Sequence, residues 1–480
     1  MSLMSREPSR RIEIAAAILV LAAAVAAYAS SLSNGFVGDD HYLVENNPLL
    51  ERGPGFSDLF LKPWGAEASG EYERRMNQGY YRPLAVALFA IEHRLWDGNP
   101  LGHHAVNVLL HAVTSLLVFW FARRFLGFKG ALAASLLFAL HAVHSEAVDA
   151  VYYRTTLLEG LLCIAALHVH GSTEPGPKGR LRGHILVMLL YILALFGKET
   201  AFPLPLYLVL YDLFIRRIRI AALDRTRYAG LALMAIGYVV LRGHVTSSGS
   251  IAYFAGVPVW SVMLTMSGVF ALYLRLLVWP HPLCAFYEWS ILPPVDDPLS
   301  PFALLGLAAV TGYLVLAAGA VVRKAPVLSF GLWLLPISLL PVLHIIPILN
   351  VAAERFLYMG SLGFCLLVGL GFDAIMERPG RALRYAAITI LLAYLLVHAA
   401  LTVRRNRAWA DDESLYRATI QDHPRSLSSR LGLGRILLLR GKANEAIEQA
   451  KGAMAIAPDL EAPRQLEHAA LEAVRNQERK

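Results

Sequence analysis

Two adjacent carboxylates, Asp39 and Asp40, have the clearest potential for chemistry in this sequence. When two carboxylates share a site that contains little water, their pKa values move apart, and one of them can act as a base. Such a base can take the proton from an acceptor hydroxyl. The pair could instead hold a divalent cation, and adjacent aspartates are also common as helix caps and in solvated loops.

Several cationic and polar side chains further along the chain could bind a substrate next to Asp39 and Asp40. Guanidinium and ammonium groups donate hydrogen bonds that match phosphate oxygens in a low-dielectric site. Cations at helix ends also extend towards the membrane surface without binding a ligand, and we expect about half of these to do so. The candidates for holding a donor phosphate are Arg82, Arg154, Lys198 and Arg355. The further candidates for contacting substrate are Tyr81, His104, His144, Glu146, Glu199, Glu354 and Tyr358.

Some of the histidines have a second interpretation. His141 and His144, together with Glu146, could ligate a metal at one helix end. His104 and His111 recur at helical spacing, so they could line one face of a membrane span. Polar groups in that position more often bond neighbouring helices than ligands, and this interpretation is favoured for His111.

The composition predicts an all-α integral membrane protein. Of the 480 residues 56% are hydrophobic and only 17% are charged, and the mean hydropathy is +0.49. These values exclude an ordinary soluble enzyme. Continuous apolar runs such as 14–28 exclude a barrel of short alternating strands. The net charge of +8 comes from basic residues that gather in short loops, which is typical of orientation in a membrane rather than of nucleic-acid binding.

The distribution of positive charge predicts how the chain crosses the membrane. Arginines before the first apolar run place the amino terminus in the cytoplasm, so the loop 33–82 with Asp39 and Asp40 faces outward. A crossing at 259–278 would move the later basic loops outside, so we expect that segment to be interfacial or re-entrant. About eleven transmembrane helices are expected, at 12–31, 106–125, 131–150, 157–170, 184–196, 202–215, 228–241, 302–322, 327–349, 356–375 and 386–403.

The carboxyl-terminal part differs in character from the rest. Residues 427–460 match the spacing of a tetratricopeptide (TPR) repeat, a helical hairpin of about 34 residues. Such repeats bury a continuous core alone only in about three copies, so this tail should dock on the bundle, a partner or a second copy. Two domains are therefore expected, a transmembrane domain at 1–405 and an extracytoplasmic TPR-like helical tail at 406–480.

The residues resemble a known family, the tetratricopeptide-bearing membrane O-mannosyltransferases of the GT-C glycosyltransferase class. The resemblance covers nearly the whole chain, and its motifs occur in the family's order. They are Asn34 to Asp40, Tyr81 to Leu84, Asn107 to His111, Phe138 to Arg154, Gly197 to Glu199, Ala353 to Tyr358 and the terminal repeat.

This resemblance implies a GT-C-type bundle and a polyprenyl-phosphate donor of sugar, often mannose. It implies an acceptor hydroxyl of Ser or Thr that approaches from outside, and inversion at the anomeric carbon. Asp39 matches the first acidic position of the family's loop motif and becomes the expected base, with Asp40 as its partner. Family members often carry longer repeat arrays, so a glycan or lipid acceptor stays open.

Two other functions remain as alternatives. A transporter or flippase would also place charges inside a bundle, although no inverted repeat of broken helices is evident. A non-catalytic scaffold could use the tail to recruit a protein partner, or to self-associate. The expected location is the plasma (inner) membrane, with the first loop and the tail outside the cytoplasm. No cofactor is implied beyond the lipid-linked donor and the divalent cation that Asp39 and Asp40 could hold.

Overall fold

The computed structural model describes residues 8–64, 79–172, 177–246, 253–345 and 348–478. Parts of four predicted segments lie outside the described residues: 1–7 before the first span, 65–78 of the first loop, 346–347 of the predicted helix at 327–349, and 479–480 of the predicted tail. The described residues form helices and loops, with one isolated β-bridge between Tyr287 and Ala352. The expectation of an all-helical protein is confirmed.

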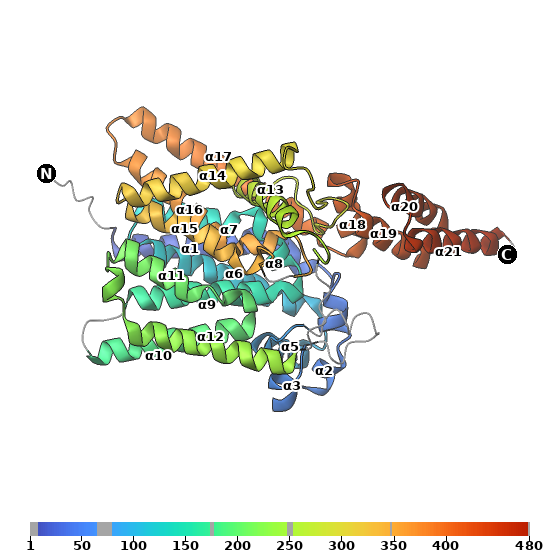
Figure 1. The fold of residues 1–480 in the computed structure, drawn as a ribbon, viewed down its shortest axis with the longest axis horizontal. Helices are drawn as coiled ribbons and strands as arrows, with labels where there is room; N and C mark the ends of the chain where they lie inside the picture. Colours follow the sequence, from blue (N-terminus) through green and yellow to red (C-terminus); the bar gives the residue numbers. More distant parts are fainter. Residues whose placement is uncertain (1–7, 65–78, 173–176, 247–252, 346–347, 479–480) are drawn as a thin grey trace.

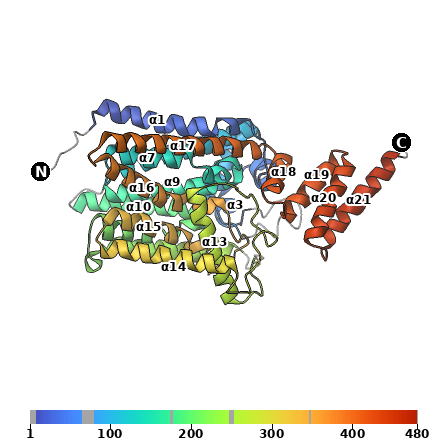
Figure 2. The same ribbon diagram turned by 90° about the horizontal axis from the view of Figure 1, so that it is seen from above.

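Most of the helices run along one direction and form a single bundle, from which a short helical tail extends (Figures 1 and 2). The longer helices of the bundle are α1 (Arg10–Tyr28), α6 (Pro100–Ala122), α7 (Phe128–Leu140), α9 (Arg154–Gly171), α10 (Pro177–Gly197), α12 (Arg225–Val245), α13 (Val259–Val278), α14 (Pro301–Val322), α15 (Pro326–Leu339), α16 (Leu357–Met376) and α17 (Arg381–Ala408). Shorter helices complete it: α2 (Pro48–Arg52), α3 (Phe56–Phe60), α5 (Pro83–Trp96), α8 (Ser145–Asp149) and α11 (Leu204–Leu210).

Eight helices of the described chain are long and apolar enough to cross a membrane, or nine if one bent pair counts as a span. This is fewer than the predicted number of about eleven. Of the segments that we expected to span, 202–215 contains only the short α11 followed by a π-helix. The apolar helix within 327–349 falls below the length of a span, and α9 is not among the candidates.

The predicted continuous helix at 131–150 is wrong. Helix α7 ends at Leu140, and the chain turns by 45° before it continues towards Asp149. The break is at His141, whose backbone is extended and whose Nδ1 accepts a hydrogen bond from the Val143 amide at 3.2 Å. A side chain that caps the following turn in this way competes with continuation of the helix.

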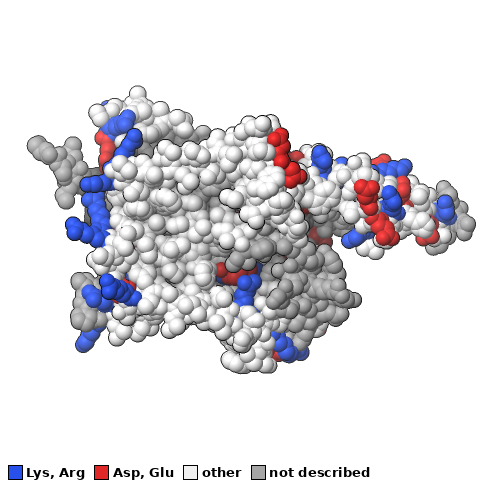
Figure 3. All heavy atoms as spheres, in the orientation of Figure 1, with Lys and Arg blue, Asp and Glu red and all other residues white. Residues whose placement is uncertain are grey.

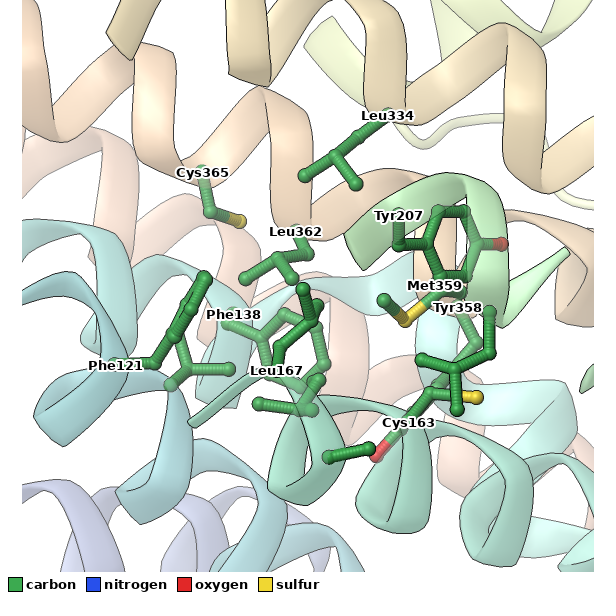
Figure 4. Packing of buried hydrophobic residues seen from close by; sticks show 14 of the residues in the cluster. Phe121, Phe138, Cys163, Leu167, Tyr207, Leu334, Tyr358, Met359, Leu362 and Cys365 are labelled. Carbon is green, nitrogen blue, oxygen red and sulfur yellow. The ribbon is translucent and has the colours of Figure 1, made fainter. Parts of the chain in front are cut away.

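Close helix packing in the core depends on glycine. A Cβ atom on Gly369 of α16 would overlap the backbone oxygen of Gly130 on α7, and a Cβ on Gly363 would overlap that of Gly331 on α15. Small residues let helices approach closely when lipid supplies no hydrophobic drive for their association. Figure 4 shows buried apolar side chains of the bundle core, including Phe121, Phe138, Cys163, Leu167, Tyr207, Leu334, Tyr358, Met359, Leu362 and Cys365.

Helix α13, which we expected to be interfacial or re-entrant, has a different direction from its neighbours. Figures 1 and 2 show it crossing the direction of α14 instead of running beside it. At the crossing, Gly306 of α14 comes so close to Gly268 of α13 that a Cβ on Gly306 would overlap the backbone of α13. The segment is long and apolar enough to span, so the interfacial location stays a prediction.

The two ends of the bundle differ in charge. Figure 3 shows lysine and arginine gathered at the end where the amino terminus lies, whereas the side of the bundle is almost free of charge. The tail extends from the opposite end and consists of α18 (Asp412–Asp422), α19 (Leu427–Leu439), α20 (Ala443–Ile456) and α21 (Glu461–Glu478). Helix α17 continues to Ala408, past the predicted domain boundary at 405.

The tail contacts the bundle at its base. Trp409 and Leu415 form a small apolar cluster with Val37 of the first loop and Ala150. Both oxygens of Glu288 accept hydrogen bonds from Ser428, whose hydroxyl lies 2.5 Å from Oε2. We expected the tail to dock on the bundle, a partner or another copy, and the contacts on this chain are with the bundle.

Candidate functional site

The acidic pair lies in the loop that follows α1, and its two carboxylates have different surroundings. Gly38, with φ of +54°, turns the chain directly before Asp39. Asp40 is fully buried, and its carboxylate accepts hydrogen bonds from the amides of Tyr152 at 2.6 Å, Val151 at 3.1 Å and Val37 at 3.2 Å. Asp40 therefore anchors the loop to the segment before α9.

Burial raises the pKa of Asp40 to about 7, although the three amide donors act in the opposite direction. Both of its oxygens are engaged, so Asp40 has little capacity left for a metal or a substrate. The hydrogen bonds of Asp40 hold the two aspartates next to the segment 151–153, which is distant in the sequence.

Asp39 is exposed to solvent, in contrast to its neighbour. Its carboxylate makes no hydrogen bond or ion pair with the described residues. Desolvation by the surrounding protein raises the pKa of Asp39, while the positive charges of Arg355 and then Arg82 lower it. An accessible carboxylate with a raised pKa, close to two cations, is suited to accept a proton from a bound hydroxyl.

Arg82 is held in a fixed orientation by Glu199. Its Nε and Nη2 donate to the two carboxylate oxygens of Glu199 at 3.1 and 2.8 Å, and its Nη1 donates to the Tyr152 hydroxyl at 2.9 Å. The guanidinium also lies 4.4 Å from the centre of the Tyr80 ring. Burial opposes the ionised form of Glu199, but the charge of Arg82 outweighs it and lowers the pKa of Glu199 to about 2. The pair is therefore charged at neutral pH.

Arg355 is oriented by a second carboxylate. Glu146 accepts hydrogen bonds from the backbone amide of Arg355, at 2.7 Å, and from its Nη1. The guanidinium lies over the ring of Tyr153, 4.0 Å from its centre. Nε and Nη2 of Arg355 make no hydrogen bond with the described residues, so these donors remain for a ligand.

Lys198 contributes a third cation on the same side. Its ammonium group donates to the Thr156 hydroxyl at 2.7 Å, and it lines a small cavity that Glu159, Arg355 and Tyr358 also line. Burial lowers the pKa of Lys198 to about 8, and the negative charge of Glu159 opposes this shift. Figure 3 shows charged atoms of both signs in a hollow on the side of the bundle, which is otherwise almost free of charge.

The base of the tail holds the other side of the acidic loop. Asp412, the first residue of α18, accepts a hydrogen bond from the Gly38 amide at 2.8 Å, and its second oxygen lies 3.1 Å from Nε2 of His41. The hydrogen bond with Asp412 is the main cause that raises the pKa of His41 to about 9. Asp39 is thus held between Asp40, anchored on the bundle, and contacts to the tail.

Comparison with known proteins finds relatives among the protein O-mannosyl-transferases. No protein-family model matches it. The chain is 28% identical over 514 residues to protein O-mannosyl-transferase TMTC1 of Homo sapiens, a match that covers 94% of this chain and 57% of that protein. It is 26% identical over 439 residues to TMTC3 of Mus musculus, covering 84% of this chain and 47% of that protein. The chain is homologous to the TMTC protein O-mannosyl-transferases.

The matches to the curated relatives are partial in length, and those to solved structures are low in identity. The chain spans about half the length of the curated relatives that it matches. Among solved structures, the oligosaccharyltransferase of Archaeoglobus fulgidus in its apo form matches with a TM-score of 0.48 and 11% identity, over 83% of this chain and 56% of that chain. The same enzyme in complex with an inhibitory peptide and a dolichol-phosphate matches with a TM-score of 0.48 and 12% identity, over 88% of this chain and 60% of that one. A similarity at this level does not assign a ligand.

Relationship to the TMTC proteins assigns no role to single residues, and some predicted site residues have structural partners. Arg154 is fully buried, and its guanidinium bonds to Glu92, to Asn107 at 2.7 Å and to the His103 carbonyl at 2.8 Å. His104 lies 3.2 Å from the carbonyl oxygen of Gly35, which ties the first loop to α6. The geometry of Arg154 is that of a structural cation rather than of a phosphate ligand.

The remaining candidates are also buried. Glu354 accepts a hydrogen bond from the Cys284 amide, and Arg405 lies 3.7 Å from its second oxygen. The hydroxyl of Tyr358 lies 3.0 Å from Nδ1 of His111, in agreement with the expected bond between helices. Tyr81 is fully buried and has a ring contact with Tyr238.

The alternative metal site at His141, His144 and Glu146 is wrong. His144 lies 3.0 Å from the Phe138 carbonyl oxygen and 2.8 Å from the Ser361 hydroxyl, so both of its nitrogens are engaged, and Glu146 binds Arg355. Within the described parts of the chain, no group of three or more His, Cys, Asp or Glu side chains could hold a metal ion.

Four side chains of the candidate site were not identified from the sequence. Tyr80, Tyr152 and Tyr153 stack on or bond to the guanidinium groups near Asp39, and Asp412 holds the acidic loop. Tyr80 directly precedes Tyr81, and Tyr152 and Tyr153 are the two residues before Arg154. That proximity in the sequence is the signal from which they could be found. No local pattern connects Asp412 with a loop more than three hundred residues earlier.

Proposed function

We propose that this protein transfers a mannosyl group from a polyprenyl-phosphate-linked donor to an acceptor hydroxyl on the outer face of a membrane, with Asp39 as the base. The observation that carries the proposal is the contrast within the acidic pair. Three backbone amides donate hydrogen bonds to the Asp40 carboxylate, whereas the Asp39 carboxylate is exposed, accepts no hydrogen bond from a described residue and interacts electrostatically with Arg355 and Arg82. The homology to protein O-mannosyl-transferases supports the reaction class.

The proposed step is a single inverting displacement. The Asp39 carboxylate takes the proton of the acceptor hydroxyl as its oxygen forms a bond to the anomeric carbon. The bond between that carbon and the phosphate oxygen breaks, and its electron pair leaves with polyprenyl phosphate. Because the leaving group is already a phosphate, the acceptor needs a base more than the leaving group needs an acid.

The cations near Asp39 would bind the donor phosphate and stabilise the charge that develops on it. Arg355 is the best placed of them, because Glu146 fixes its orientation and leaves Nε and Nη2 unbonded. Lys198 lines the same cavity and has hydrogen-bonding capacity beyond Thr156. Carboxylate partners that hold cations in place reduce the reorganisation needed when charge develops.

The charge distribution of the bundle supports an outer location for this site. Basic side chains gather at the end with the amino terminus, which the positive-inside rule assigns to the cytoplasm (Figure 3). Asp39 follows α1 and lies at the other end, beside the tail. Nucleotide sugars are cytoplasmic, so a donor that arrives through the membrane on a lipid fits this side better.

The acceptor in this proposal is a hydroxyl of a protein Ser or Thr, or of a glycan. The tail adjoins the acidic loop through Asp412, so it is positioned to present a bound acceptor or to recruit a partner near Asp39. We also propose that 427–460 acts as a TPR-like interaction segment, because α19 and α20 form a helical hairpin with Gly441 at its turn.

Transfer of labelled mannose by the purified full-length chain in proteoliposomes tests this proposal. Polyprenyl-phosphate mannose and a nucleotide-linked mannose are offered in parallel, with acceptor peptides that contain Ser and Thr and with a glycan acceptor. The proposal predicts product from the lipid-linked donor alone. Movement of the donor across the bilayer without product would instead identify a flippase, and absence of both with folded protein would favour a scaffold.

A further inference from the structure

A second cationic site lies at the junction between the bundle and the tail. An open cavity of about 280 Å³ lies between the end of α17, α18 and the segment that follows α13. Four arginines line it, namely Arg404, Arg405, Arg407 and Arg417, whereas Asp422 is the one carboxylate among the described lining residues. None of these residues lines the cavity that contains Lys198 and Arg355.

Two of these four arginines have no ion-pair partner within the described chain. Arg417 is paired with Glu413 at 2.8 Å and with Glu445 at 2.9 Å. Arg404 and Arg407 are exposed, and neither makes a hydrogen bond or an ion pair with a described residue. The cavity therefore presents two free guanidinium groups to an incoming anion.

Arg405 supplies the observation that points to a ligand. It is only 6% exposed, yet its Nε and Nη2 atoms have no hydrogen-bond partner among the described residues. Its ion pair with Glu354 is long, at 3.7 Å. Nε and Nη2 are closed to solvent, and Nη2 faces Glu354. The third donor, Nη1, is not closed off in this way and makes no hydrogen bond with a described residue, so it remains for a phosphate oxygen, which guanidinium groups match in geometry.

The position of the cavity along α17 favours a lipid as the source of that phosphate. Helix α17 has 28 residues and is about 42 Å long at 1.5 Å per residue, so it exceeds the apolar thickness of about 30 Å. Its last turns, from Leu401 onward, would extend to the level of the headgroups. Leu283 and Leu401 add apolar walls to the cavity. Arginines at the outer end of a span also depart from the positive-inside pattern, which is expected if they bind an anion there.

We propose that this cavity binds the phosphate of a membrane-lipid headgroup, in contact with Arg404, Arg405 and Arg407, and that the bound lipid joins α17 to α18. The site is distinct from the donor site of the proposed transferase and does not depend on the transfer reaction. Because α18 begins with Asp412, a lipid bound here would also steady the contact between the tail and the acidic loop.

Native mass spectrometry of the full-length protein in detergent tests the proposal. Phosphatidylglycerol is the probe, dioleoylglycerol is the lipid without phosphate, and glycerol 3-phosphate is the soluble source. The Arg404→Gln/Arg407→Gln double variant is compared with Arg425→Gln/Arg435→Gln, which removes the same charge from two exposed tail arginines outside the cavity. We expect the first pair to weaken phosphatidylglycerol binding at least tenfold, and the control pair to bind like the unchanged protein.

Three results would overturn the proposal. Equal phosphatidylglycerol binding by both double variants would show that the cavity is not the site. Glycerol 3-phosphate that binds as tightly as the lipid would identify a soluble anion site. A raised KM for the lipid-linked mannose donor in Arg404→Gln/Arg407→Gln, with unchanged phosphatidylglycerol binding, would make the cavity part of the donor site. Equal thermal midpoints of the variants without lipid establish that folding is intact.

Discussion

Removal of the Asp412 charge should loosen the loop that carries Asp39. In Asp412→Asn the remaining oxygen can still accept the hydrogen bond from the Gly38 amide, whereas the new NH₂ group cannot accept from His41. The lost interaction is an ion pair whose side chains are 23% and 35% exposed, so solvent screening limits it to about 1 kcal/mol. Asp412→Ala loses the Gly38 hydrogen bond as well, which contributes about another 1 kcal/mol.

Hydrogen–deuterium exchange of the amides at 35–45, at pH 7 in nanodiscs, measures this loosening. Losses of about 1 and about 2 kcal/mol correspond to exchange that is about 5-fold faster in Asp412→Asn and about 30-fold faster in Asp412→Ala. Asp459→Asn, which changes an exposed tail aspartate, is the matched control. Unchanged exchange at 35–45, or an equal rise in the control, would refute the role of Asp412.

The same contact should respond to pH with a definite sign. The pKa of His41 is raised from 6.5 to about 9. The stabilisation that protonated His41 provides is therefore complete below about pH 6.5 and is lost as the pH rises through 9. Asp412→Asn removes the main cause of the raised pKa. The difference between the variant and the unchanged protein should therefore shrink above pH 9.

Three further predictions concern the acidic pair and the cations. Burial raises the pKa of Asp40 to about 7, so its contribution to stability should fall as the pH rises from about 4 to 7, and thermal midpoints at pH 5 and 8 should differ less in Asp40→Asn. Arg355→Lys should raise the KM for the lipid-linked donor about tenfold, because a single ammonium cannot reproduce the paired Nε and Nη2 donors of the planar guanidinium. Arg378→Lys at the basic end should leave that KM unchanged. Because the pKa of Lys198 is lowered to about 8, donor KM should rise above pH 8, and Lys198→Arg should move that rise to higher pH in steady-state kinetics.

Local sequence patterns predicted that the protein is all-helical and that its charged residues lie near one another. Apolar runs predicted an all-helical bundle, although with more spans than the structure has. The distribution of basic loops grouped Asp39, Arg82, Lys198 and Arg355, and the structure brings these residues into one neighbourhood. The partners of these cations could not be predicted, because they depend on the register between helices. Glu199 and Glu146 are as charged as other candidates in the sequence, and only packing decides which cation each one meets.

The difference between Asp39 and Asp40 is likewise a long-range property. The residue types alone do not distinguish the two, and only the family resemblance favoured Asp39 as the base. The amides of Val151 and Tyr152, more than a hundred residues later, select Asp40 as the anchor. The break at His141 escaped prediction for a related reason, since an apolar run does not reveal that a histidine side chain will cap the next turn.

The transfer rate of Asp39→Asn with polyprenyl-phosphate mannose tests the central claim most directly. The Asp39 carboxylate is exposed and bonds to no described residue, so the variant should keep its thermal midpoint and its donor KM. Loss of a general base should lower kcat by about 10²- to 10⁴-fold. A kcat within twofold of the unchanged protein, with normal folding, would contradict the assignment of Asp39 as the base.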